Sequence, residues 1–142
     1  MQKYLNKISG PLLDRIDIHV EVTPVSYNEL SAERISEKSV TVRERVIKAR
    51  DIQEKRYAAK EGVHCNAQIN SKQLREFCKI DEAGNQLLKT AMERLGLSAR
   101  AYDRILKVAR TIADLESSEN ILTNHLAEAI QYRSLDRDGW AG

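Results

Sequence analysis

The stretch SARAYDRILKVARTIADL at residues 98–115 decides the fold class of this chain. Its apolar residues recur every three or four positions, which at about 100° per residue places them on one face of an α-helix. These residues are Ala101, Ile105, Val108, Ala109, Ile112 and Leu115. Ser98 stands before them and is a residue type that caps helix N-termini. We therefore predict a helix from Ser98 to about Glu116 with one buried face.

Helical patterns also flank this stretch. Asp81 opens a helix with apolar residues on one side, and Gly96 supplies a left-handed stop at its end. Ser71 is predicted to cap a short helix that runs to about Lys79, and Thr123 is predicted to cap a last helix. The residues expected to face inward from these helices are Ala83, Leu87, Leu88, Ala91, Leu95, Leu126, Ala127 and Ile130. Helices packed on helices are therefore the expected architecture.

The segments between residues 24 and 69 carry weaker signals. The polar stretch 24–38 is predicted to be a linker, and 39–59 has a helical period among dense charges. The stretch 61–69 contains Gly62 and Asn66 and is predicted to be a loop. The sparse apolar stripe of the charged helical stretch consists of Val42, Val46, Ala49 and Ile52.

Residues 16–22 show the only strong strand pattern. Four β-branched residues alternate with Asp17, His19 and Glu21, a period of two that is typical of a strand with one buried face. On this pattern His19 should face solvent. A single strand leaves its backbone groups without partners, so we expect this one to belong to a larger sheet.

The composition is that of an ordinary globular protein. The chain of 142 residues has 23 basic and 21 acidic side chains, a net charge of +2, and only 5% aromatic residues. Such a balance does not by itself indicate a nucleic-acid partner. The two cysteines and three histidines have no metal-ligand spacing, and no apolar run approaches the roughly 18 residues of a membrane span. A cytoplasmic location and no bound metal are expected.

Motifs for self-contained catalysis are missing from the sequence. There is no GxxxxGK[ST] phosphate-binding loop, no run of apolar residues followed by paired acids, and no HExxH. A chain without the first two cannot hold ATP phosphates and Mg²⁺ in the P-loop manner by itself. We therefore do not expect this chain alone to be an enzyme.

Arginine supplies the remaining candidates for chemistry. Arg15 directly precedes the predicted strand, and Arg100 lies in the first turn of the predicted helix at 98–116, where free N–H groups favour anions. Arg104, Lys107 and Arg110 extend a basic stripe along that helix and are candidates for contact with DNA or a neighbouring subunit. The alternative from pattern alone is that Arg15 forms an ordinary ion pair and that the stripe is a solvated face.

Several stretches resemble one family. The stretch ISGPLLDRID at residues 8–17 resembles the segment after sensor 1 in ComM-type (YifB-like) magnesium-chelatase-like AAA+ ATPases. It is also similar to the LLSRFD stretch of MCM helicases, with Asp14 in place of Ser and Ile16 in place of Phe. Resemblance to the C-terminal domain of the family continues in NAQI at 66–69, LREFC at 74–78, GLSARAYDRILKVARTIADL at 96–115 and AEAIQYR at 127–133. It spans about Tyr4 to Arg137 and is weakest over 24–38.

The resemblance implies roles for two arginines. Arg15 matches the arginine finger, which acts in trans on ATP bound by the adjacent subunit. Arg100 matches the sensor-2 arginine, which contacts the γ-phosphate; because the lid is repositioned in this helicase and chelatase clade, its action within one subunit or across the interface is left open. ATP and Mg²⁺ would be cofactors of a full-length protein whose P-loop, Walker B acids and sensor 1 lie upstream.

The fold implied by the resemblance is mainly α. It is a helical-bundle AAA+ lid domain preceded by a single strand-forming segment left over from an α/β AAA+ core. The expected divisions are the edge of the core at 1–23, the linker at 24–38, the helical lid at 39–135 and a flexible tail at 136–142.

The implied function is that of the lid and sensor-2 region of a hexameric AAA+ ATPase. The ring would couple ATP hydrolysis to DNA remodelling by branch migration during natural transformation and recombination, with itself and DNA as partners. Two alternatives remain open. One is a non-enzymatic helical module that binds nucleic acid or protein, and the other is the motor subunit of a metal-chelatase complex.

Overall fold

The computed structural model describes residue 12 and residues 15–25 and 36–133, and these residues are mainly helical. The helices are α4 (Ser39–Tyr57), the short 3₁₀ helix η1 (Asn66–Gln68), α5 (Ser71–Phe77), α6 (Glu82–Leu95), α7 (Ala99–Leu115) and α8 (Thr123–Gln131). No strand occurs among the described residues. The predicted mainly helical class is confirmed.

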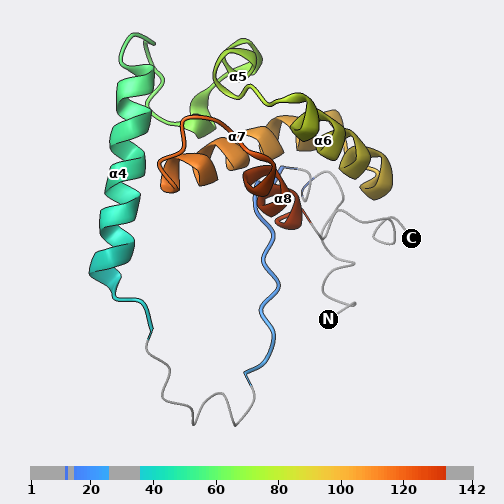
Figure 1. Ribbon diagram of the computed structural model, residues 1–142, viewed down its shortest axis with the longest axis horizontal. Helices are drawn as coiled ribbons and strands as arrows, with labels where there is room; N and C mark the ends of the chain where they lie inside the picture. The colour runs from blue at the N-terminus through green and yellow to red at the C-terminus, as the bar shows by residue number, and fades with distance from the viewer. Residues whose placement is uncertain (1–11, 13–14, 26–35, 134–142) are drawn as a thin grey trace.

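Helix α7 forms the centre of the bundle (Figure 1). It packs against α4 on one side and α8 on the other, with η1 and α5 also in contact, and α8 packs in turn against α6. Ala101, Ile105 and Ala109 on its apolar face are completely buried, as is Leu126 of α8. The small alanine side chains let neighbouring helices approach α7 closely, so the sequence at 98–115 does determine the core.

Three predicted helix ends are confirmed. The Ser98 hydroxyl accepts a hydrogen bond from the Ala101 amide at 3.1 Å, and the Asp81 carboxylate accepts one from the Gly84 amide at 2.7 Å. Gly96 ends α6 in the left-handed conformation with φ of 61°. Glycine adopts this conformation without the steric cost of a Cβ atom.

Two predicted caps are wrong by one residue. Asn70, rather than Ser71, caps α5, because its side-chain oxygen accepts hydrogen bonds from the amides of Lys72 and Gln73, both at 3.0 Å. At the start of α8 the cap position is Leu122, and Thr123 is already helical. Leu122 has no polar side chain to cap the helix. Instead, the side chain of His125, the third residue of α8, accepts a hydrogen bond from the Leu122 amide at its Nδ1 atom, at 3.0 Å.

The segment 16–22 does not form the predicted strand. It is extended without a ladder partner among the described residues, and the side chains expected to be buried, Ile16, Ile18, Val20 and Val22, are exposed. His19, predicted to face solvent, is instead buried, with only 7% of its surface exposed. The alternation of a strand determines burial only when a sheet lies on one side of it.

Helix α4 extends past the bundle at its N-terminal end (Figure 1). Its C-terminal half buries Ala49, Gln53 and Tyr57, whereas Val42 and Val46 of the predicted stripe remain exposed. Within the described part of the chain, no helix combines the length and the hydropathy that a bilayer-spanning segment needs. The predicted tail at 136–142 and most of the predicted linker lie outside the described residues.

Candidate functional site

Arg100 lies in the first turn of α7 and is exposed. Ser98 satisfies the Ala101 amide at this helix end, and the helix dipole adds a partial positive charge there. A guanidinium beside such a terminus can bind phosphate oxygens with planar, two-point geometry. Arg100 therefore lies in the setting that the sequence predicted.

Arg15 is exposed at the start of the described N-terminal segment. Its backbone amide donates to the Leu12 carbonyl at 3.1 Å, which forms a turn just before the chain becomes extended. An exposed arginine at the start of an extended segment can reach a group outside the chain. Where its guanidinium can reach depends on what holds this segment in place.

Three polar links tie the segment after Arg15 to the helical bundle. Arg104 of α7 forms an ion pair with Asp17, and the Arg133 guanidinium donates to the Ile16 carbonyl. The His19 amide donates to the Tyr132 carbonyl at 2.8 Å. The structure thus brings Asp17 into contact with α7, and Ile16 and His19 into contact with the residues that directly follow α8.

The predicted basic stripe on α7 is not one open surface. Arg104 is paired with Asp17, and Lys107 donates to the Ala67 carbonyl at 3.0 Å. Arg110 is only 3% exposed, so its inclusion in a DNA-facing or subunit-facing stripe is wrong. Arg110 lies on the side of α7 that faces the loop following this helix. Carbonyl groups of that loop accept its hydrogen bonds, so its guanidinium does not reach solvent.

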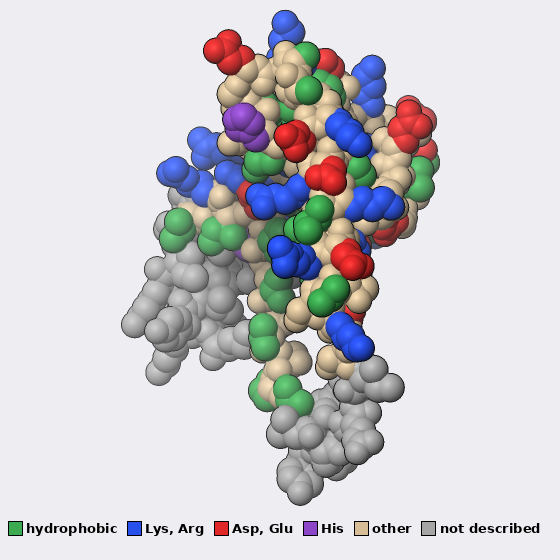
Figure 2. Space-filling model, turned by 90° about the vertical axis from the view of Figure 1, so that its left-hand side faces the viewer, with side chains coloured by type: hydrophobic (Ala, Val, Ile, Leu, Met, Phe, Trp, Pro, Cys, Tyr) green, Lys and Arg blue, Asp and Glu red, His purple; other side chains and the backbone are tan. Residues whose placement is uncertain are grey.

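Figure 2 views the side of the molecule where α4 lies. Lysine and arginine side chains alternate there with aspartate and glutamate, and apolar side chains line the lower part of the same side. Phosphate backbones bind surfaces on which basic side chains are gathered, because affinity rises with the number of phosphates neutralised. On this side, the described residues show no such gathering over α4, where basic and acidic side chains are interspersed.

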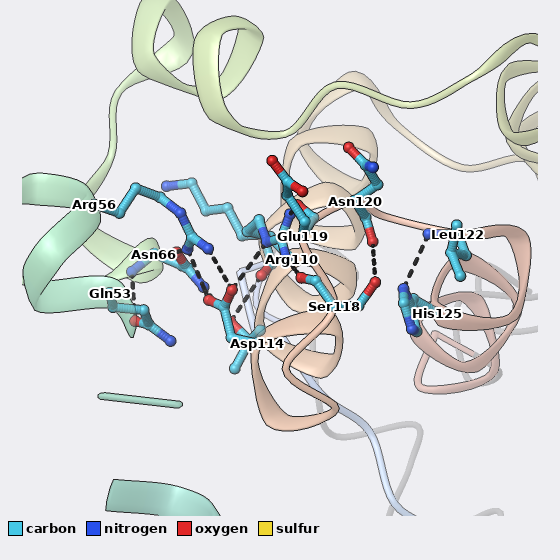
Figure 3. Close-up of polar contacts among 12 residues, drawn as sticks. Gln53, Arg56, Asn66, Arg110, Asp114, Ser118, Glu119, Asn120, Leu122 and His125 are labelled. Atoms are coloured by element: carbon cyan, nitrogen blue, oxygen red, sulfur yellow. Dashed lines mark hydrogen bonds and ion pairs between the residues drawn. The ribbon is translucent and has the colours of Figure 1, made fainter. Parts of the chain in front are cut away.

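A buried charge cluster centred on Asp114 joins three parts of the bundle (Figure 3). Its carboxylate accepts hydrogen bonds from Arg56 of α4 at 2.5 and 2.8 Å, from Arg110 Nε at 3.1 Å and from Asn66 Nδ2 at 2.8 Å. Asn66 also accepts from the Tyr57 hydroxyl at 2.7 Å. Sequence reasoning missed this cluster; its one local signal was the four-residue spacing of Arg110 and Asp114.

Arg110 also completes the C-terminal end of α7. Its two terminal nitrogens donate to the Ser118 carbonyl at 2.6 Å and the Glu119 carbonyl at 2.8 Å. Burial lowers the pKa of Arg110, whereas for Arg56 the same effect of burial is outweighed by the hydrogen bond and charge of Asp114, which raise its pKa. Both guanidinium groups remain charged at neutral pH, so the cluster is an ionic support of the fold.

The described residues offer no metal centre, because nowhere in them do three His, Cys, Asp or Glu side chains gather closely enough to hold an ion. The candidate site is a pair of exposed arginines, Arg15 and Arg100.

Two family models match the chain. The model described as magnesium chelatase, subunit ChlI C-terminal, matches residues 36–133, which is most of the chain. The model described as magnesium chelatase, subunit ChlI, matches residues 1–30. The first match covers all the helices α4 to α8, and the second covers the segment that carries Arg15.

Curated relatives match over nearly the whole chain. Competence protein ComM of Haemophilus influenzae is 45% identical over 139 residues, which are 96% of this chain and 26% of the relative. Uncharacterized protein YifB of Escherichia coli is 43% identical over 95% of this chain. Uncharacterized protein Rv2897c of Mycobacterium tuberculosis is 35% identical over 93%. The chain spans about a quarter of the length of these relatives.

Proposed function

The chain belongs to the magnesium chelatase ChlI C-terminal family and is of the ComM and YifB type, and from this we propose that it is the lid and sensor-2 region of an AAA+ ATPase. The observation that carries the proposal is the pair of exposed arginines. One lies at the start of the central helix, and the other lies on a segment joined to that same helix.

Each arginine has a distinct role in this proposal. Arg100 contacts the γ-phosphate of ATP and makes the position of the lid depend on the nucleotide. Arg15 acts in trans on ATP bound by the adjacent subunit and stabilises the charge that spreads over the transferred phosphoryl oxygens. Bound Mg²⁺ would neutralise β- and γ-phosphate charge, and the P-loop that holds both would come from another part of a full-length protein.

The proposed assembly is a hexameric ring in the cytoplasm that remodels DNA by branch migration in natural transformation and recombination. The name competence protein ComM, carried by the Haemophilus relative, supports a link to DNA uptake. Arg104 and Lys107 of α7 are half-buried and have partners within the chain, so they can contact a neighbouring subunit or DNA only if they give up these internal partners.

A motor subunit of a metal chelatase is the second candidate, because the printed name of the matched family is that of a magnesium chelatase subunit. The effect of DNA on ATP hydrolysis distinguishes the DNA motor from the chelatase motor. Branched DNA should stimulate ATP hydrolysis by a DNA motor and should leave that of a chelatase motor unchanged. A non-enzymatic DNA-binding module is less well supported, because the charges of Arg104, Lys107 and Arg110 have partners within the chain.

Steady-state ATP hydrolysis by the full-length protein tests the proposal. We expect Arg15→Ala to lower kcat by about 10³- to 10⁵-fold, the range found for arginine fingers, and Arg100→Ala to lower turnover strongly as well. Lys89→Ala, at an exposed position of α6, is the matched control and should hydrolyse ATP at the wild-type rate. Normal turnover by both arginine variants would reject the proposed roles.

A further inference from the structure

We propose that Arg104 and Arg133 are positioning residues that hold the segment carrying Arg15 against the helical bundle. This inference rests on the proposed role of Arg15 as a finger. It assigns Arg104 a task within the chain, in place of contact with DNA. It also makes the nucleotide-sensing helix and the finger parts of one connected unit within each subunit.

The first observation is the position of the contacts. Arg104 pairs with the carboxylate of Asp17, which is two residues after Arg15. Arg133 donates to the carbonyl of Ile16, which directly follows Arg15. The His19 amide, two residues further on, donates to the Tyr132 carbonyl at 2.8 Å. Contacts at residues 16, 17 and 19 fix both the position and the direction of the backbone that leads to Arg15.

The second observation is that apolar packing contributes little to this attachment. Ile16 and Ile18 are 40% and 47% exposed, and Asp17 and Ile18 line an open groove of about 280 Å³ between the segment and helices α7 and α8. Burying an apolar side chain stabilises a contact in proportion to the area removed from water. Because Ile16 and Ile18 bury little area, the segment depends strongly on its polar links, and a charge reversal at Asp17 or Arg104 should loosen its attachment to the bundle.

The third observation is the location of Arg104 on α7. Arg104 follows Arg100 by four residues, so the two lie on the same face of the helix about one turn apart. A shift of α7 that follows nucleotide contact at Arg100 therefore moves the residue that holds Asp17. By this path, the state of the nucleotide at Arg100 changes the placement of Arg15 for the neighbouring subunit.

A charge swap in the full-length protein tests the inference. Asp17→Arg and Arg104→Glu should each lower kcat for ATP hydrolysis about tenfold or more, with KM for ATP within about twofold, because each disturbs the finger without touching the bound nucleotide. The double variant Asp17→Arg/Arg104→Glu restores an ion pair of opposite polarity and should regain most of the lost kcat. Lys89→Glu, an exposed charge reversal on α6, should leave kcat unchanged.

Hydrogen exchange on the same proteins reads out the attachment independently of activity. The His19 amide should exchange faster in each single variant and return toward the wild-type rate in the swap. A swap that restores neither kcat nor this protection would overturn the inference. So would single variants that match wild type in both measurements while Arg15→Ala is inactive.

The outcomes separate this inference from the proposed function. If Arg15→Ala itself hydrolyses ATP normally, the finger assignment fails, whatever Arg104 does. If Arg15→Ala is inactive, mixing Asp17→Arg subunits with P-loop-dead subunits should regain activity, because the second kind supplies a correctly held finger to the intact ATP sites of the first. No regain in that mixture contradicts a positioning role that acts between subunits.

Discussion

Asp114 of α7 is completely buried, and its carboxylate accepts two hydrogen bonds from the guanidinium of Arg56, at 2.5 and 2.8 Å. Arg56 lies near the C-terminal end of α4, 58 residues earlier in the chain. The contact fixes the position of α4 against the central helix, and the only apolar residues of α4 that are fully buried are Ala49 and Tyr57. A buried ion pair of this kind is costly to break from one side.

Asp114→Ala should therefore destabilise the chain strongly. Removing the carboxylate leaves Arg56 and the buried Arg110 without their shared anion, and breaking a buried pair in this way costs about 3–5 kcal/mol. Urea unfolding followed by circular dichroism measures the change in the free energy of unfolding. The exposed pair of Lys60 and Glu76 is the control, because Glu76→Ala should cost no more than about 1 kcal/mol. Equal effects of the two substitutions would contradict the supporting role of Asp114.

Ser117→Gly should stabilise the chain by about 0.5–1 kcal/mol, since glycine adopts a left-handed conformation without the cost that a Cβ atom brings. Ser117 has a φ of 58°, and it follows α7 where its amide donates to the Asp114 carbonyl at 3.0 Å and the Ser118 amide donates to the Ala113 carbonyl at 2.8 Å. This pair of bonds is the Schellman arrangement, in which glycine is the preferred residue. A thermal melt should show a higher Tm.

Ser118→Gly is the matched control for that substitution. Ser118 is not among the described residues with positive φ, and its hydroxyl donates to the Asn120 carbonyl at 2.8 Å. Glycine at this position removes the hydrogen bond and adds freedom to the unfolded chain, so Tm should fall. If both glycine variants shift Tm in the same direction, backbone strain at Ser117 is not the cause.

The stability of the chain should fall at alkaline pH because of a buried thiol. Burial raises the pKa of Cys78 from an ordinary value of 9.0 to about 11, so the folded state keeps its proton where the unfolded state loses it. The stabilisation that the protonated Cys78 thiol contributes to the folded state is complete below about pH 9 and is lost as pH rises toward 11. Burial acts in the same direction on Tyr57, whose pKa is raised to about 12.

Urea midpoints measured from pH 7 to 11 test this dependence. We expect a flat region up to about pH 9 and a decline above it, with a smaller decline in Cys78→Ala. Leu74→Ala is a control in the same part of the core, because it removes a buried side chain that does not titrate. It should lower every midpoint and keep the wild-type slope. An unchanged slope in Cys78→Ala would exclude the thiol as the titrating group.

Local patterns predicted the features of the fold that neighbouring residues determine. The buried face of α7, the Ser98 and Asp81 caps and the left-handed Gly96 all follow from residue types within a few positions of one another. Spacing of three and four residues is sufficient to place a helical face because the geometry of the helix is fixed. The helical class could therefore be predicted from residues 81–116 alone.

Features that depend on distant residues could not be predicted. Arg56 and Asn66 carry no local sign that they meet Asp114, which lies 58 and 48 residues away. His19 has the alternation of a strand residue, yet it is buried, and its backbone amide donates to Tyr132, more than a hundred positions later. The spacing of Arg110 on α7 indicates a basic stripe, but its burial depends on two carbonyls of the loop after α7, which the spacing does not reveal.

The most direct test of the central claim is a mixing experiment on the full-length protein. Arg15→Ala subunits keep their own ATP site and lack the finger, whereas P-loop-dead subunits keep the finger and lack the ATP site. ATP hydrolysis is measured for each variant alone and for mixtures across a range of ratios. We predict that each is inactive alone and that the mixtures regain activity, because Arg15 completes the site of its neighbour. Arg15→Ala subunits that hydrolyse ATP normally, or mixtures that stay inactive at every ratio, would contradict this account.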